Sequence, residues 1–89
     1  MWQIIFGKKA QKQFNTLESQ IKKRIAKFID ERLITSNNPR ELDKALVGAS
    51  FGNHFRFRVG DYRLICDIKD KEITVLILRI AHRKEVYNG

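Results

Sequence analysis

The sequence predicts an α+β fold: an N-terminal strand, then a helical hairpin packed on one face of a small antiparallel sheet. Apolar residues recur every three or four positions from Leu17 to Leu33, which is the period of an amphipathic helix. From His54 to Val59 apolar and polar residues alternate, which is the period of a strand. The chain has 89 residues, so a single domain over residues 1–89 is expected.

The first half is expected to contain one strand and two helices. Trp2–Phe6 reads as a short strand and Lys8–Phe14 as a short basic helix. A longer helix is expected over Glu18–Ile34, because its apolar residues fall on one face: Leu17, Ile21, Ile25, Phe28, Ile29 and Leu33. Residues 35–39, which include the only proline, end this helix, and residues 40–50 form a connector.

Three antiparallel strands are expected in the second half. Gly60-Asp61 follows the alternating strand 54–59 and suits a two-residue type II′ turn, with glycine at its first position. Tyr62–Ile68 is the return strand, and a second turn at Lys69–Lys71 leads to Ile73–Ile80. This last run is almost entirely apolar, as expected for a central strand.

The charge balance indicates a polyanionic partner. Lys and Arg number 18 against 10 Asp and Glu, a formal net charge of +8, and such a field concentrates polyanions near the surface. Nucleic acid is the commonest candidate, although an anionic membrane, an acidic protein or a role in solubility alone remain open. The single cysteine, Cys66, excludes an intramolecular disulfide and is expected to be a small buried apolar residue.

The sequence shows no sign of a signal peptide, a membrane span, a metal site or a cofactor site. Residues 1–6 lack the basic start and long apolar stretch of a signal peptide, and no run approaches the roughly 18 apolar residues of a membrane span. A cytoplasmic location is therefore expected. Two histidines, one cysteine and scattered carboxylates give no metal-ligand spacing, so neither a metal nor a small-molecule cofactor is expected.

The tight turn gathers arginines on one face of the sheet. A turn at Gly60-Asp61 places Arg58 opposite Arg63, with Arg56 on the same face. Like charges directly across a strand pair are destabilising. An anion held between the two arginines would explain their placement.

The facing of the last strand depends on the second turn. If that turn is centred on Asp70-Lys71, Arg63 lies opposite Leu78 and His82 continues on the same face. A turn longer by one residue reverses the facing. We expect His82 to project toward the arginines, and Arg79, which has the opposite parity, to be structural or at an interface.

These residues are the parts of a metal-free ribonuclease. The expected catalytic residues are Arg56, Arg58, Arg63, His82, Arg83 and Tyr87, and the expected RNA-binding residues are Arg56, Arg58 and Lys84. Guanidinium groups bind phosphate through two bonds and offset the charge that develops in a pentavalent state. Histidine exchanges protons near neutral pH, and a tyrosine ring stacks on bases. The nucleophile would be the 2′-hydroxyl of the RNA itself.

The runs Phe55–Leu64 and Ile77–Tyr87 resemble the RelE branch of the RelE/ParE toxin superfamily. The resemblance extends over nearly the whole chain, including Leu46–Gly48, where the connector leads to the three closing strands. It implies the microbial-ribonuclease-like RelE fold, ribosome-dependent cleavage of mRNA in the ribosomal A site, and inhibition by a cognate RelB-like antitoxin. It also implies basic residues at the strand positions of the arginines, an arginine at Arg83 and a terminal tyrosine at Tyr87.

The resemblance and the arginine cluster together predict specific roles. Arg56, Arg58 and Arg63 hold the scissile phosphate, and Arg83 binds it or assists the leaving 5′ oxygen. His82 is the first choice for proton transfer because arginine stays protonated, and Tyr87 orients or stacks the neighbouring base. The expected products are a 2′,3′-cyclic phosphate and a 5′-hydroxyl.

Two other functions remain open from the sequence. A ParE-like inhibitor of DNA gyrase would share the fold without needing a ribonuclease site. A non-catalytic RNA-binding module would use the basic face for affinity alone. The helical lysines are either a solvated face or contacts to ribosomal RNA: Lys8, Lys9, Lys12, Lys22, Lys23 and Lys27.

Overall fold

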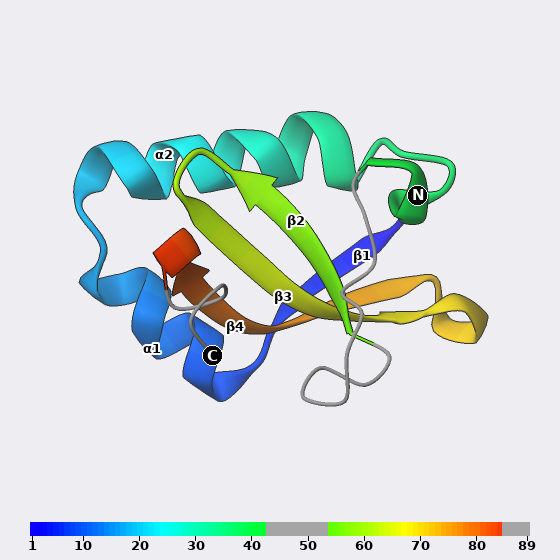
Figure 1. Cartoon of the computed structure of the whole chain (residues 1–89). Helices are drawn as coiled ribbons and strands as arrows, with labels where there is room; N and C mark the ends of the chain where they lie inside the picture. Colours follow the sequence, from blue (N-terminus) through cyan, green and yellow to red (C-terminus); the bar gives the residue numbers. More distant parts are fainter. Residues whose placement is uncertain (43–53, 85–89) are drawn as a thin grey trace.

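A computed structural model, which describes residues 1–42 and 54–84, shows a four-stranded sheet with two helices against it (Figure 1). In chain order the elements are β1 (Gln3–Phe6), α1 (Lys8–Thr16), α2 (Ser19–Phe28), η1 (Ile29–Leu33), η2 (Pro39–Leu42), β2 (Phe55–Val59), β3 (Tyr62–Lys69), η3 (Asp70–Glu72) and β4 (Thr74–His82). The strand order is β1-β4-β3-β2. The predicted α+β class is confirmed. The sheet is mixed, because β1 pairs in parallel with β4 while the other pairs are antiparallel.

The core lies between the helices and one face of the sheet. Ile25 from α2 and Leu33 from η1 are fully buried, as are Phe57 and Leu64 from the sheet. The ring of Phe28 lies 5.9 Å from the ring of Phe57, so this face of β2 looks toward α2. Because side chains alternate along a strand, Arg56 and Arg58 project from the opposite face. The helix predicted over residues 18–34 is therefore present, although its last turn is a π-helical segment.

The β2–β3 hairpin has the predicted register. Val59 pairs with Tyr62, Arg58 with Arg63 and Phe57 with Leu64. Gly60 has φ of 61°, whereas Asp61 does not have a positive φ. A positive φ at the first turn position alone is the signature of a type II′ turn, so the predicted turn type is confirmed.

The β3–β4 hairpin is less regular than predicted. Lys69 pairs with Thr74, which leaves residues 70–73 as the connection. Farther along, Cys66 pairs with Ile77 but Ile65 pairs with Arg79. Leu78 is therefore an extra residue in β4, a β-bulge.

The bulge overturns the predicted facing of β4. Arg63 pairs with Ala81, so the expectation that it lies opposite Leu78 is wrong. The connection is longer than expected by two residues, and an even change of that kind preserves the facing. The single extra residue, Leu78, reverses it from Arg79 onward.

Helix α1 and the residue before it hold the bulged segment. The amide of Gly7 donates to the carbonyl oxygen of Ile77 at 2.8 Å, and the amide of Ile80 donates to Oε1 of Gln13 at 2.8 Å. A Cβ at Gly7 would lie 3.2 Å from that Ile77 oxygen, so glycine permits the close approach. Because β1 ends at Phe6, the Gln13 side chain takes the place of a strand partner for β4.

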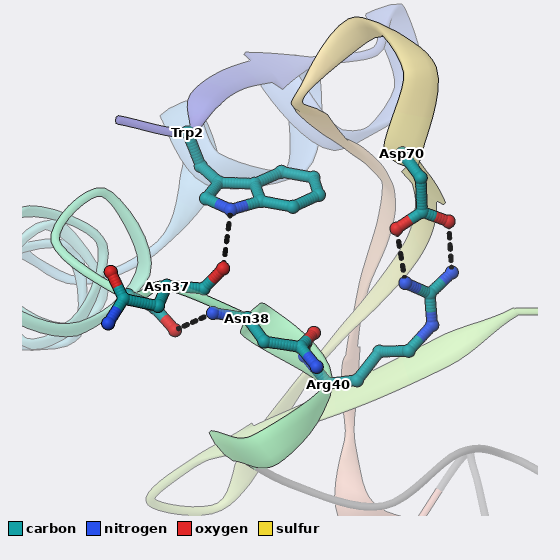
Figure 2. Close-up of polar contacts among 6 residues, drawn as sticks. Trp2, Asn37, Asn38, Arg40 and Asp70 are labelled. Atoms are coloured by element: carbon teal, nitrogen blue, oxygen red, sulfur yellow. Dashed lines mark hydrogen bonds and ion pairs between the residues drawn. The ribbon is translucent and has the colours of Figure 1, made fainter.

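Beyond the end of β3 at Lys69, polar contacts connect η2 to η3, and Trp2, just before β1, to the segment after η1 (Figure 2). Arg40 donates from Nη1 and Nη2 to the two carboxylate oxygens of Asp70, at 2.5 and 2.9 Å. This hydrogen bonding holds the pKa of Asp70 below its usual value. The indole nitrogen of Trp2 donates to the carbonyl oxygen of Asn37 at 3.3 Å.

Candidate functional site

Arginines form two rows across the sheet face that looks away from the helices. The first row runs from Arg58 through Arg63 to Ala81, and the second runs from Arg56 through Ile65 to Arg79. The rows lie two residues apart along the strands, roughly 7 Å. We call Arg56, Arg58, Arg63 and Arg79 the arginine face.

Arg63 is the most deeply set member of the arginine face. Its side chain lies on the central part of the sheet, and the residue is only 6% exposed. Its Nη1 donates to the carbonyl oxygens of Gly60 and Tyr62, each at 2.9 Å. Its Nε is buried and has no hydrogen-bond partner in the described part of the chain. The guanidinium is therefore fixed by main-chain carbonyls beside the turn.

Arg56 and Arg58 flank Arg63 on β2, the edge strand. Arg58 is exposed and Arg56 is half-buried. Within residues 1–42 and 54–84, Nε of Arg56 is also a buried donor with no acceptor. An unpaired buried donor costs about 1–3 kcal/mol, so an anion with several acceptor oxygens would stabilise this face.

Two further guanidinium groups approach the β2–β3 turn. The amide of Arg83 donates to the carbonyl oxygen of Asp61 at 2.8 Å, and its Nε lies 3.7 Å from Oδ1 of Asp61. Arg24 of α2 reaches the same turn, because a Cβ built on Gly60 would lie 2.7 Å from its Nη1. Lys84, which follows Arg83, is exposed. The structure thus places Arg83 beside the β2–β3 turn, next to the row of Arg58 and Arg63.

The sequence did not single out Arg24. It lies on the polar side of a helix, where a charged residue is ordinary. Only the packing of α2 over the turn brings it to Gly60.

His82 does not share the arginine face. It pairs with Tyr62 on the helix-side face, with the two rings 5.4 Å apart in an edge-to-face arrangement. Its Nδ1 accepts a hydrogen bond from the amide of Lys84 at 3.2 Å. The expectation that His82 projects toward the arginines is wrong, because the bulge at Leu78 reverses the facing. The same reversal puts Arg79 on the arginine face, whereas the sequence predicted a residue of opposite facing that is structural or at an interface.

Tyr87 and the segment Leu46–Gly48 lie outside the described residues. Cys66 is fully buried, as predicted, and burial raises the pKa of its thiol, which disfavours the nucleophilic thiolate.

Across residues 1–42 and 54–84, no three His, Cys, Asp or Glu side chains are grouped to hold a metal ion. No helix in the same ranges has the length and apolar character needed to cross a bilayer.

Comparison with known proteins gives consistent matches over nearly the full chain. Residues 4–87 match the family model described as the ParE toxin of the type II toxin-antitoxin system parDE. The toxin RelE3 of Methanocaldococcus jannaschii is 32% identical over 87 residues, which cover 96% of this chain and 94% of that protein.

Two solved toxin-antitoxin complexes have the same fold. One is RelBE2 of Mycobacterium tuberculosis, with a TM-score of 0.79, 30% identity and coverage of 92% of this chain and 91% of the other. The second is the RelE–RelB complex of Pyrococcus horikoshii OT3, with a TM-score of 0.73, 28% identity and coverage of 92% and 94%. The similarity therefore includes the sheet that carries the arginine face.

Proposed function

Because the chain belongs to the RelE/ParE superfamily and is a type II toxin of the RelE type, we propose that it is a metal-independent endoribonuclease that cleaves mRNA in the ribosomal A site. One observation carries this proposal. Arg58 stands directly opposite Arg63 on the sheet face that the helices leave uncovered. Repulsion between like charges across a strand pair destabilises the fold. A phosphate between the two guanidiniums would form charge-assisted hydrogen bonds with both and offset that repulsion.

The proposed reaction is an internal transfer at phosphorus. The 2′-oxygen of the RNA attacks the adjacent phosphorus and loses its proton, and the bond from phosphorus to the 5′ oxygen breaks. The leaving 5′ oxygen takes up a proton, which gives a 2′,3′-cyclic phosphate and a 5′-hydroxyl. Arg58 and Arg63 bind the non-bridging oxygens, on which negative charge increases in the transition state.

Further residues complete the proposed site. Arg83, held at the turn by Asp61, binds the phosphate beside Arg63 or assists the leaving 5′ oxygen. Tyr87 orients the neighbouring base. We assign His82 to positioning rather than proton transfer, since its Nδ1 accepts the Lys84 amide and its ring packs on Tyr62.

We also propose two macromolecular partners. The similar structures named above are complexes of RelE with RelB, so a cognate RelB-like antitoxin is proposed for this chain. Its carboxylates would neutralise the arginine face. The ribosome is the second partner, because the net charge of +8 favours association with ribosomal RNA.

The test is cleavage of ribosome-bound messenger, mapped by primer extension. Arg63→Met should lower the rate by about 10²-fold or more, the usual effect of removing one donor to a developing oxyanion. His82→Gln should have a much smaller effect. Arg32→Met is the matched control, because Arg32 is an exposed arginine on the helical side, over the ring of Phe28.

A wild-type rate in Arg63→Met would overturn the proposed site. Growth arrest with broken DNA and intact messenger would instead support a gyrase inhibitor. Salt-sensitive RNA binding without any cleavage would support a non-catalytic module.

A further inference from the structure

The second row of the arginine face pairs two guanidiniums across an apolar residue. Arg56 on β2 and Arg79 on β4 both lie beside Ile65 of β3, which is 6% exposed. Their Cα atoms are two strand spacings apart, roughly 10 Å. Two arginine side chains can reach an anion above Ile65 from opposite sides across such a span.

The β-bulge is what gives this row its second guanidinium. If alternation continued without interruption from Ile77, Leu78 would pair with Ile65 and Arg79 would point to the helix side. The extra residue makes Arg79 the partner of Ile65 and so places Arg79 on the arginine face. Gly7 and Gln13 hold the segment on either side of Leu78 by hydrogen bonds to Ile77 and Ile80.

The environment of this row favours a ligand with several acceptor oxygens. Ile65 offers no acceptor, and Nε of Arg56 is a buried donor without a partner in the described ranges. Guanidinium groups bind phosphate through paired N–H bonds. A phosphate above Ile65 would contact both arginines at once.

We propose that Arg56 and Arg79 form a second phosphate subsite, which binds the phosphate next to the scissile one in the RNA chain. This inference rests on the proposed function, because that function assigns the scissile phosphate to Arg58 and Arg63. The two rows are roughly 7 Å apart along the strands, so one RNA strand can lay successive phosphates on them. The site then requires a substrate with at least two phosphates.

The test measures binding without cleavage. Oligouridylates with a 2′-deoxy group at the cut position are titrated by NMR into the isolated chain. A dinucleotide carries one phosphate, and two trinucleotides carry a second phosphate on the 5′ or the 3′ side. For the wild type, one of the trinucleotides should bind roughly tenfold more tightly than the dinucleotide, as for one additional charge-assisted contact.

Arg79→Met keeps the aliphatic stem and removes the charge. It should abolish the tenfold gain and leave the dinucleotide affinity unchanged. For the tighter trinucleotide, the slope of log affinity against log salt should fall by about 0.7. Arg32→Met removes one charge from the helical side and should retain the gain. Arg79→Lys retains the positive charge and the aliphatic stem but not the planar guanidinium group. It should therefore recover part of the tenfold gain in affinity.

Some outcomes separate the subsite from the nuclease. The subsite is refuted if Arg79→Met retains the gain, or weakens dinucleotide and trinucleotide equally; cleavage of ribosome-bound messenger by the wild type would then leave the nuclease standing. Length-dependent binding that is lost in Arg79→Met, with no cleavage by the wild type, would support the subsite and refute the nuclease.

Discussion

The two hairpins of the sheet each contain one residue with a positive φ, yet they set side-chain facing in different ways. Gly60 has φ of 61° in a two-residue turn, and the β2–β3 register is uniform. Ile73 has φ of 50° in a longer connection, and the β3–β4 register shifts by one residue inside the strands. In the first hairpin the turn alone decides which side chains share a face. In the second, a bulge supported by a distant helix decides it.

The largest effect is expected at the tight turn. Gly60→Val should lower the free energy of unfolding by about 3 kcal/mol, because a β-branched residue is strained at positive φ and Arg24 must move to admit a Cβ. Urea unfolding measures the loss. Asp61→Ala, at the second turn position, should cost much less, because Asp61 does not have a positive φ. Equal losses in the two variants would show that strain at φ is not the cause.

The bulge should be sensitive to its support from α1. Gln13→Ala removes the acceptor for the partly buried Ile80 amide and should cost about 1–2 kcal/mol. Hydrogen exchange at the Ile80 amide should accelerate, which localises the effect to β4. Gln11→Ala is the control, since the Gln11 side chain donates to Oδ1 of the exposed Asn15, and it should change stability by less than about 0.5 kcal/mol. If both variants behave alike, the bulge does not depend on α1.

We expect a substitution in the β3–β4 connection to stabilise the protein. Ile73 is half exposed and strained at positive φ, so Ile73→Asn should raise the free energy of unfolding by about 1 kcal/mol. Ile73→Val, which retains the β-branch, should bring no gain. A loss of stability in Ile73→Asn would mean that contacts of the isoleucine outweigh its strain.

The smallest effect is expected at the exposed ion pair of Arg40 and Asp70. The hydrogen bond from Arg40 lowers the pKa of Asp70, so the carboxylate stabilises the fold above its unfolded pKa of about 3.9. That contribution is lost as pH falls through the lower folded pKa. Asp70→Asn should therefore be less stable than wild type at pH 7 and indistinguishable from it in strong acid. A difference that persists in acid would argue against the ion pair as its source.

Much of the fold and part of the site follow from local pattern. Gly60-Asp61 is a turn dipeptide whose geometry fixes the β2–β3 register, and so the common face of Arg58 and Arg63. The bulge at Leu78 has no local sequence signal, because it lies within an apolar run and the residues hydrogen-bonded on either side of it, Gly7 and Gln13, are far away in the chain. The facing of His82 and Arg79 was therefore exchanged in the prediction. Arg24 was missed for a related reason, since only tertiary packing brings a helix side chain to the turn.

The single additional residue in the last strand has a consequence for comparing relatives. Two toxins of this fold can end in the same sequence and still present opposite side chains on the sheet face that carries Arg63, if only one of them carries the insertion at Leu78. Gain or loss of one codon in this strand would turn every later side chain of the strand to the opposite face of the sheet, without altering the rest of the gene. Equivalent positions in the terminal segment are therefore defined by hydrogen-bonded pairing to β3, and not by alignment of the closing motif.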